Sequence, residues 1–483
     1  MTLDPDACYR ALRSRDGRFD GVFYVGVATT GVYCRPICPA RTPARERCTF
    51  FGRAAEAERA GFRACFRCRP EIAPGLAIVD SVPRLVRAAV ARIDAGALNE
   101  RSIDALAGSL GVTSRHLRRS LEAELGVSPV ELAQTRRLAL AKQLLHDTAL
   151  PLAQVAFAAG FGSVRRFNAA FLARFGRPPS VLRKSRVGEG DGALSIRLGY
   201  RAPLDSAALL AFLRARAIPG VEVVDGAGLR RTVSLGRGTG VVSARFDDDR
   251  RVLRALVSPS LAPKLMEIAA RLRALFDLDL CPDLVAEHLG KDRLLAERVA
   301  ARPGLRVPGA FDGFETAVRA VLGQQVSVRA ATTVCGRLVA AFGQRVETDE
   351  PRLTHAFPTA ESLAQASSSR IQSLGLPAAR ARTVAALARA VARGRVDLAP
   401  GADPAAAIAA LQEVPGIGPW TAHVVAMRAL RWPDAFPAAD LGVLRALGVR
   451  TAAAAERAAA PWSPWRAYAV LHLWTPVVHG DRP

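Results

Sequence analysis

The sequence has no long apolar run. Half of its 483 residues are hydrophobic, yet no uninterrupted stretch approaches the roughly 18 residues that a membrane-spanning helix needs. The start, Met1 to Asp6, lacks the basic and apolar regions of a signal peptide. These absences predict a cytoplasmic chain with no membrane partner. Its length exceeds what one hydrophobic core organises, which indicates three or four domains.

Lysine is scarce, because only four of the 67 basic residues are Lys and the others are Arg. The formal net charge is nevertheless +23. Residues 1–190 hold 30 basic and 17 acidic groups, and the remaining residues hold 37 and 27, so both parts are basic. This distribution favours more than one polyanion-binding surface. An Arg-rich chain can also reflect the nucleotide composition of its gene, so the charge is only supporting evidence for polyanion binding.

Half of the eight cysteines form two close pairs. Three residues separate Cys34 from Cys38, two separate Cys65 from Cys68, and 26 lie between the pairs. Disulfides are unfavourable in a reducing compartment, whereas two close pairs are a usual arrangement for tetrahedral zinc. The spacing therefore predicts one Zn²⁺ ion bound by these four thiolates. The cysteines that match no ligand pattern are interpreted as apolar thiols: Cys8, Cys48, Cys281 and Cys335.

The residues around these cysteines narrow the prediction. The segments 29–38 (TTGVYCRPIC) and 60–70 (AGFRACFRCRP) are similar to the amino-terminal domain of the Ada family, which regulates the response to DNA methylation. The resemblance implies that Cys34 irreversibly accepts a methyl group from a methylphosphotriester in DNA. Zinc would keep its thiolate deprotonated and nucleophilic. The arginines expected to help hold the DNA backbone are Arg35, Arg41 and Arg67.

Charge gives this reaction a physical consequence. Four thiolates around Zn²⁺ carry a net charge near −2 by addition, and methylation of Cys34 changes it to about −1. A smaller negative charge lessens the repulsion from DNA, so methylation can act as a switch. The alternative is a structural zinc site in a constitutive DNA-binding protein without methyl transfer.

A helical motif occurs twice between the first domain and residue 186. In segment 103–112 apolar residues recur at helical spacing up to a Gly turn, and Ser114 can cap a second helix with outward-facing basic side chains. The pattern returns at 155–161, about 49 residues later, and is followed by Ser163. One repeat is also typical of a helical hairpin in a bundle. The doublet resembles the AraC-type DNA-binding domain, which implies two recognition helices in successive major grooves. The arginines expected to face DNA are Arg115, Arg118, Arg165 and Arg166.

A small domain of different character follows. Residues 70–83, with Pro74 and Gly75, predict a hinge, and residues 187–192 (VGEGDG) predict a flexible linker. Beyond them, 194–198 and 231–235 alternate as strands, and 204–216 has helical spacing. The pattern predicts an α+β domain similar to the amino-terminal domain of the AlkA family. Helical spacing then dominates to the end of the chain.

A hairpin with the sequence VPGIGPWTA occupies residues 414–422. Pro415 ends one helix and Pro419 opens the next. Gly416 and Gly418 suit a turn whose N–H groups approach a large anion such as a DNA phosphate, because a Cβ atom would block a positive φ and the approach. An ordinary helix-to-helix turn also uses Gly and Pro.

The hairpin resembles that of the helix-hairpin-helix superfamily of DNA glycosylases, in which an Asp follows. That residue is Asp440 here. Segment 314–326 (FETAVRAVLGQQV) looks like the first catalytic-domain helix of the AlkA alkyladenine glycosylases. Trp420 stands where glycosylases that also cut the backbone carry a Schiff-base Lys. The resemblance therefore implies a monofunctional enzyme that excises N-alkylated purines such as 3-methyladenine.

The expected chemistry suits a single carboxylate. An N3- or N7-alkylated purine is already cationic and leaves readily, so the positive charge that grows on the sugar is what needs stabilisation. A nearby carboxylate stabilises that charge and can orient or deprotonate the attacking water. We assign both roles to Asp440. The alternative is an Asp that caps the helix beginning at Leu441.

An enzyme of this kind holds its extruded base against aromatic walls. Trp420 and Trp474 match aromatic positions of the family's pocket, although an unassigned Trp is more often a core residue. Three positions depart from the family pattern. Val424 and Leu441 stand where the best-known relative has Tyr, and Gln325 stands where it has an intercalating Leu. These departures leave the substrate range open.

The sequence thus predicts a multi-domain, mainly α, monomeric protein that binds double-stranded DNA at damaged sites and at a promoter, with RNA polymerase as a candidate partner. A monofunctional glycosylase is fused to a methylphosphotriester-accepting transcription regulator, and the hairpin carbonyls are a candidate site for a monovalent cation. The alternative is a methylation-triggered activator with a weak or inactive glycosylase module. No Pro-Cys-His-Arg segment is present, so direct repair of O6-alkylated guanine is not predicted.

The expected domains are an α/β zinc domain (1–75), an all-α double helix-turn-helix domain (80–186), an α+β domain (193–300) and an all-α glycosylase domain (301–483).

Overall fold

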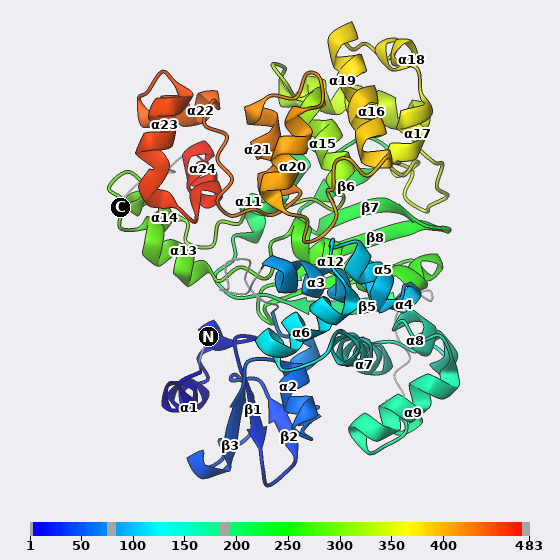
Figure 1. Cartoon of the computed structure of the whole chain (residues 1–483), viewed down its shortest axis with the longest axis vertical. Coiled ribbons are helices and arrows are strands. Elements are labelled where there is room, and N and C mark those ends of the chain that lie inside the picture. Colours follow the sequence, from blue (N-terminus) through cyan, green and yellow to red (C-terminus); the bar gives the residue numbers. More distant parts are fainter. Residues whose placement is uncertain (1–2, 75–83, 183–193, 476–483) are drawn as a thin grey trace. The chain divides into compact units, whose positions relative to one another are not determined.

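The computed structural model describes residues 3–74, 84–182 and 194–475. The chain divides into two compact units, one of Met1–Arg201 with Leu235–Arg273 and one of Ala202–Ser234 with Ala274–Pro483 (Figure 1). The greater part of the expected hinge at 70–83 and the whole expected linker at 187–192 lie outside the described residues. Within the described parts, no helix combines the length and the hydropathy that crossing a membrane requires.

The first unit begins with helix α1 (Pro5–Ser14) and a small sheet of order β3-β1-β2-β4. Strand β1 (Tyr24–Val27) pairs antiparallel with β2 (Val32–Cys34) and β3 (Cys48–Phe51). The two-residue strand β4 (Arg63–Ala64) follows helix α2 (Ala54–Arg59) and pairs parallel with β2. Because parallel strands end at the same edge of a sheet, the residues after β2 and β4 emerge side by side. The α/β character expected here is confirmed.

A helical domain with two helix-turn-helix pairs follows. The first pair is α5 with α6 and the second is α8 with α9, and each turn contains a glycine in the left-handed region, Gly111 at φ +70° and Gly160 at φ +87°. The N-cap of α6 is Thr113, whose hydroxyl accepts the N–H of His116 at 3.2 Å. The expectation that Ser114 caps this helix was one residue too late. The helices are α3 (Arg84–Asp94), α4 (Ala97–Glu100), α5 (Ile103–Gly108), α6 (Ser114–Leu125), α7 (Pro129–Asp147), α8 (Leu152–Ala158), α9 (Val164–Phe175) and α10 (Pro179–Leu182).

Helix α7 carries buried ion pairs to the small sheet domain. The Lys142 ammonium donates to the Glu71 carboxylate and to the carbonyl of Cys65, both at 2.9 Å. At the end of the same helix, the Asp147 carboxylate accepts two bonds from the Arg69 guanidinium, at 2.7 and 2.9 Å. All four of these charged side chains are buried. The sheet domain and the helix-turn-helix domain are therefore joined by charge pairs of defined geometry.

The predicted α+β region is confirmed as an antiparallel sheet with one helix. The strands have the order β5-β9-β8-β7-β6, and the helix α11 (Ser206–Arg214) lies between β5 and β6 in the chain. The expected strand at 231–235 is the second half of β7. The strands are β5 (Leu194–Gly199), β6 (Glu222–Asp225), β7 (Gly228–Leu235), β8 (Gly238–Asp247) and β9 (Val252–Val257).

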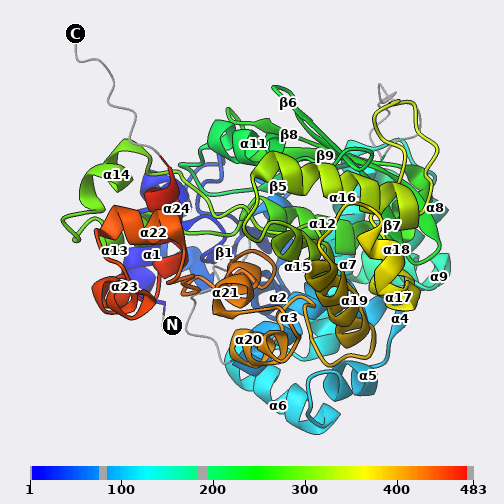
Figure 2. The same ribbon diagram turned by 90° about the horizontal axis from the view of Figure 1, so that it is seen from above.

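The rest of the chain is helical, as expected. Helix α15 packs against α16, α19 and α21 around one apolar core. Figure 2 shows α20 and α21 in the region of this core. Ion pairs of Glu315 with Arg231 and of Arg319 with Glu222, at 2.7 and 3.1 Å, anchor α15 to strands β6 and β7. The helices are α12 (Leu265–Leu275), α13 (Pro282–Leu289), α14 (Ala296–Ala301), α15 (Gly313–Leu322), α16 (Val328–Phe342), α17 (Ala360–Gln365), α18 (Ser368–Gln372), α19 (Ala378–Ala392), α20 (Pro404–Gln412), α21 (Pro419–Arg428), α22 (Leu441–Leu447), α23 (Ala452–Ala459) and α24 (Arg466–Trp474).

Candidate functional sites

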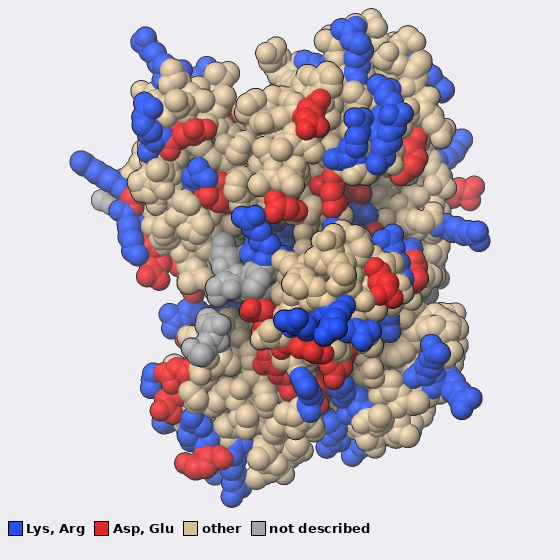
Figure 3. All heavy atoms as spheres, in the orientation of Figure 1, with Lys and Arg blue, Asp and Glu red and all other residues tan. Residues whose placement is uncertain are grey.

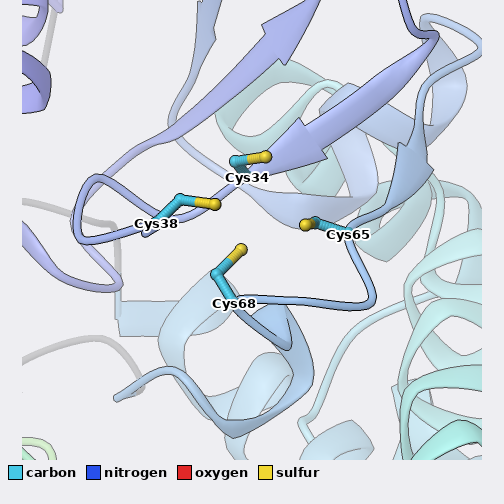
Figure 4. Close-up of side chains that lie close together, drawn as sticks. All are labelled: Cys34, Cys38, Cys65 and Cys68. Atoms are coloured by element: carbon cyan, nitrogen blue, oxygen red, sulfur yellow. The ribbon is translucent and has the colours of Figure 1, made fainter. Parts of the chain in front are cut away.

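The four paired cysteines come together at the edge of the small sheet. Cys34 ends β2 and Cys65 follows β4, and the parallel register that opposes Tyr33 with Ala64 brings the two thiols to the same edge. Tight turns after each strand return Cys38 and Cys68 to this point. Figure 4 shows the four sulfur atoms directed toward a common centre.

The geometry of this cluster fits a zinc ion. All four Sγ atoms lie within 4.8 Å of one another. Four Zn–S bonds of 2.3 Å in a tetrahedron place the sulfur atoms about 3.8 Å apart, so small side-chain adjustments suffice for coordination. Thiolates are also soft ligands that favour zinc over Mg²⁺ or Ca²⁺.

Cys34 differs from the other three cysteines in exposure, and from Cys65 and Cys68 in hydrogen bonding. It is partly exposed, whereas the others are at most 7% exposed. Backbone N–H groups of Arg35 and Arg67 donate to the sulfur atoms of Cys68 and Cys65, each at 3.3 Å. Among the described residues, no backbone bond of comparable geometry is found to the sulfur atoms of Cys34 and Cys38. Hydrogen bonds draw electron density from a thiolate, so Cys65 and Cys68 are the weaker nucleophiles, and exposure distinguishes Cys34 from Cys38 as the more accessible sulfur.

The arginines expected around the cluster occupy two different environments. Arg41 and Arg67 are exposed. Arg35 is buried, forms a salt bridge with Asp20, and donates to the carbonyl of Cys68 at 3.1 Å. Its guanidinium therefore supports the turn that carries Cys68, and this placement differs from the expected contact with DNA.

The basic residues assigned to the two recognition helices face solvent. Arg115 and Arg118 on α6 and Arg165 and Arg166 on α9 are exposed. The neighbouring apolar residues Leu117 and Phe167 are fully buried. Each helix therefore presents a basic face while its apolar face packs in the domain. Figure 3 shows further Lys and Arg side chains distributed over the visible face, including a group in the region of α16 to α19.

A second site surrounds Asp440, the N-cap of α22. Its Oδ1 atom accepts backbone N–H bonds from Gly442 at 2.9 Å and Val443 at 3.1 Å. The same oxygen accepts the indole N–H of Trp474 at 2.9 Å, and Oδ2 accepts that of Trp420 at 3.0 Å. Asp440 is thus a helix cap and the centre of a four-donor cluster. Its partial exposure keeps it open to a ligand.

The two tryptophans reach this carboxylate from separate helices. Trp420 lies in the first turn of α21, directly after the hairpin, and Trp474 is the last residue of α24. Both are half-buried, so neither is a fully enclosed core residue. The hydrogen bonds to Asp440 were not foreseen from the sequence. The signal that could have revealed them is the indole N–H itself, which needs an acceptor wherever a Trp is partly buried.

The hairpin glycines are not equivalent. Gly416 has φ +90°, and a Cβ atom there would lie 2.1 Å from Thr383 Oγ1. That hydroxyl donates to the carbonyl of Pro415 at 2.9 Å, so α19 supports the turn directly. Gly418 has φ −92° and open space around its Cβ position. The expected positive φ is therefore confirmed at Gly416 and is wrong at Gly418. At Gly418 the missing Cβ atom only leaves room for a ligand to approach the backbone closely.

The three departures from the family pattern have different surroundings. Val424 is 9% exposed and belongs to the apolar core beneath α21. Leu441 is 67% exposed, next to Asp440. Gln325 is exposed on the loop between α15 and α16, at φ +52°. The preceding residue, Gln324, bonds to the hairpin through its side chain and was not singled out from the sequence.

Family models match the chain in four consecutive stretches. Residues 7–71 match the metal binding domain of Ada, and 106–185 match a helix-turn-helix domain. Residues 195–312 match the AlkA N-terminal domain, and 318–456 match the HhH-GPD superfamily of base excision DNA repair proteins.

Curated relatives match this chain over its whole length or over part of it. The "probable bifunctional transcriptional activator/DNA repair enzyme AlkA" of Mycobacterium tuberculosis is 42% identical over 490 residues, which cover 99% of this chain and 98% of the relative. The "DNA-3-methyladenine glycosylase 2" of Escherichia coli is 38% identical over 277 residues, which cover 57% of this chain and 95% of that protein. Among solved structures, a 3-methyladenine DNA-glycosylase from Archaeoglobus fulgidus matches 58% of this chain and 97% of its own, with a TM-score of 0.50 and 21% identity, which supports the fold.

The cysteine cluster predicts a defined zinc content. We expect about one zinc ion per chain, and Cys65→Ser should lose it during dialysis against a chelator, because a serine hydroxyl is a poor zinc ligand. The matched control is Cys48→Ser, a buried thiol of the same domain outside the cluster. Atomic absorption on the dialysed full-length proteins measures the result. Equal zinc in the two variants would contradict the assignment.

Proposed function

The chain belongs to the family of bifunctional transcriptional activator/DNA repair enzymes of the AlkA type, and from this premise we propose how its residues carry out the two activities. It is a DNA-3-methyladenine glycosylase joined to an Ada-type, methylation-sensing transcription regulator that binds DNA. The observation that carries the proposal is the carboxylate of Asp440, held by two indole N–H groups at the start of α22.

In the glycosylase, we assign the stabilisation of the sugar cation to Asp440. Its Oδ1 atom already accepts three N–H bonds, whereas Oδ2 accepts one. The remaining acceptor capacity is therefore concentrated on Oδ2. That oxygen is the one we expect to face the positive charge on the sugar and the attacking water as the bond to the cationic purine breaks. The donors hold the carboxylate in place, so little reorganisation accompanies the reaction.

Trp420 and Trp474 have two tasks in this proposal. Their N–H groups position Asp440, while their half-exposed rings are available to stack against an extruded base. The position of Trp420 also accounts for a monofunctional reaction. An indole nitrogen cannot form the imine through which other glycosylases cut the strand. We assign binding of the phosphate next to the lesion to the hairpin N–H groups at Gly416 and Gly418. Gln325 is assigned to contact with the duplex.

In the sensor, we assign methyl acceptance to Cys34. Its thiolate sulfur attacks the methyl carbon of a methylphosphotriester, so an S–C bond forms, the C–O bond breaks, and the phosphate leaves as an ordinary phosphodiester anion. Cys38, Cys65 and Cys68 complete the zinc ligand set, and bound zinc keeps the thiolates deprotonated. The greater exposure of Cys34 supports this choice of acceptor. Arg41 and Arg67 are the exposed cations that would neutralise the neighbouring phosphates.

The regulator is proposed to read a promoter with α6 and α9. Arg115 and Arg118 would enter one major groove, and Arg165 and Arg166 the next. RNA polymerase is the proposed protein partner, and the chain is proposed to act as a monomer. The four-part domain division at 1–75, 80–186, 193–300 and 301–483 remains a prediction.

We also propose a monovalent cation at the hairpin. Backbone carbonyl oxygens are suitable ligands for hard cations. The carbonyls of Pro415 and Gly416 already accept bonds from Thr383 and Gln324. A carbonyl oxygen has a second lone pair, so the ion would be held by carbonyls of residues 412–418, including those that already accept one hydrogen bond.

The first test is base release from randomly methylated duplex DNA. Wild type should release 3-methyladenine without cutting the strand, and Asp440→Asn should lower the rate by about 10²–10³, the usual effect of removing one electrostatic stabiliser. The matched control is Asp403→Asn, because Asp403 caps α20 through two backbone N–H bonds and Asn caps a helix equally well. No release by wild type that still binds DNA would contradict the glycosylase assignment.

The positioning role of Trp474 predicts a loss of kcat when only its N–H is removed. Trp474→Phe keeps an aromatic ring but loses one hydrogen bond to a charged acceptor, so we expect a fall of about 10–100-fold. Trp462→Phe is the control, because Trp462 donates its indole N–H to Asp292 at 2.8 Å elsewhere in the same unit. Single-turnover and steady-state excision rates separate kcat from KM. A change in KM alone would leave stacking as the only role of Trp474.

The assignment of Cys34 predicts where the methyl group is found. After incubation with duplex DNA that carries a methylphosphotriester, peptide mass spectrometry should detect one added methyl group per chain, on Cys34, with zinc retained. Cys34→Ala should accept none. Methylation at Cys38, Cys65 or Cys68 of the wild-type protein would show that a different thiolate is the nucleophile.

A further inference from the structure

The loop between α15 and α16 has an unusual local conformation. Gln325 has φ +52°, a region that non-glycine residues rarely occupy and that functional loops often contain. Its neighbours include two exposed valines, Val326 at 39% and Val328 at 41%. A strained polar residue beside exposed apolar side chains is suited to insertion between bases rather than to packing in a core.

The adjacent residue, Gln324, ties this loop to two other elements. Its side-chain Nε2 donates to the carbonyl of Gly416 in the hairpin at 3.0 Å. The same nitrogen donates to Oγ1 of Thr421 in α21 at 2.9 Å. An amide nitrogen has two hydrogens, so both are used. One side chain therefore joins the loop, the hairpin and the helix of the proposed pocket wall.

Helix α19 holds the same loop and hairpin from a second direction. The Arg380 guanidinium donates to the backbone carbonyl of Gln324 at 2.7 Å. One turn further along, Thr383 Oγ1 donates to the carbonyl of Pro415 at 2.9 Å. Residues three apart lie on one face of a helix, so α19 fixes both partners, and Gln324 adds the direct connection between them. The loop and the hairpin are thus parts of one braced structure.

This brace continues to the reactive group. Thr421, whose hydroxyl accepts the bond from Gln324, is directly preceded in α21 by Trp420, whose indole N–H donates to Asp440 Oδ2 at 3.0 Å. A displacement of the loop is therefore transmitted through Gln324 to the start of α21 and from there to the carboxylate. The connection consists of hydrogen bonds of normal length, of which those to Thr421 and Asp440 join partly buried groups and the one to Gly416 is exposed.

We propose that Gln324 is a positioning residue that couples insertion of the Gln325 loop into the duplex to the alignment of Asp440. The proposal rests on the glycosylase function proposed above and names the residue that regulates its site. When the hairpin holds a phosphate, the brace fixes the distance from that phosphate to the inserted loop. The extruded nucleotide then arrives where Asp440 Oδ2 can act on its sugar.

The test compares two DNA substrates that carry the same methylated purine. In one, the lesion is paired within a duplex and must be extruded. In the other, it lies in an unpaired bulge, where extrusion costs little. Gln324→Met has nearly the same shape as Gln but no donors. We expect it to slow excision of the paired lesion about tenfold, the effect of losing two neutral hydrogen bonds, and that of the bulged lesion by less than about twofold.

A second variant and a control keep the result interpretable. Arg380→Gln removes the other anchor of the loop and should show the same preference for the bulged lesion. Gln344→Met is the matched control, because the Gln344 side chain accepts a bond from Ser234 away from the loop, and it should leave both rates unchanged. Fluorescence of 2-aminopurine beside the paired lesion should report slower extrusion in the first two variants alone.

The outcomes separate this inference from the proposed function. Equal slowing on both substrates would mean that Gln324 only shapes the pocket, and unchanged rates on both would mean that the brace is dispensable. Either result overturns the inference while the glycosylase function stands. If the wild-type chain released no base from either substrate, the proposed function would fail and the inference with it.

Discussion

Both groups proposed to react in this chain are anions that would work beside a polyanion. In the proposed reactions, the thiolate cluster of the sensor and the carboxylate of Asp440 would each approach the charged backbone of DNA and would be repelled from it. The structure surrounds both with N–H donors. Backbone amides reach Cys65 and Cys68, and two amides with two indoles reach Asp440. Donors of this kind stabilise negative charge without adding net charge, and two buried cations beside the cysteine cluster, Arg35 and Lys142, are paired with Asp20 and Glu71.

Buried charge pairs also attach the sensor to the regulator. Lys142 contacts the carbonyl of Cys65 and the buried Glu71, and Arg69 pairs with Asp147. Removing such charges from water costs several kcal/mol per ion, which their attraction roughly offsets. Buried pairs of this type contribute little net stability, but they are satisfied in one geometry only. The zinc-ligand turn is therefore held in a defined position on α7, the central helix of the double helix-turn-helix domain.

The sequence was most informative where a function needs fixed local spacing. The cysteine pairs, the two helix-turn-helix repeats and the glycine hairpin each lie within short segments, and all were found from residue patterns. Contacts between distant segments could not be found in this way. Arg35 follows Cys34 in the sequence, and only the fold reveals that Arg35 is buried and forms a salt bridge with Asp20. The bond between Gln324 and Gly416 spans 92 residues, and no local periodicity encodes it.

Two alternatives that the sequence set against each other at Asp440 are physically compatible. A capping Asp and a reactive Asp differ in which oxygen is used. Capping engages Oδ1 through Gly442 and Val443, and the Trp474 indole adds a third donor to the same atom. Oδ2 has only Trp420 as its partner. The helix terminus therefore restrains rotation of the carboxylate about its own axis and leaves the second oxygen with acceptor capacity. The helix cap therefore fixes the direction in which the carboxylate of Asp440 points. The proposed stabilisation of a short-lived sugar cation requires such a rigid acceptor.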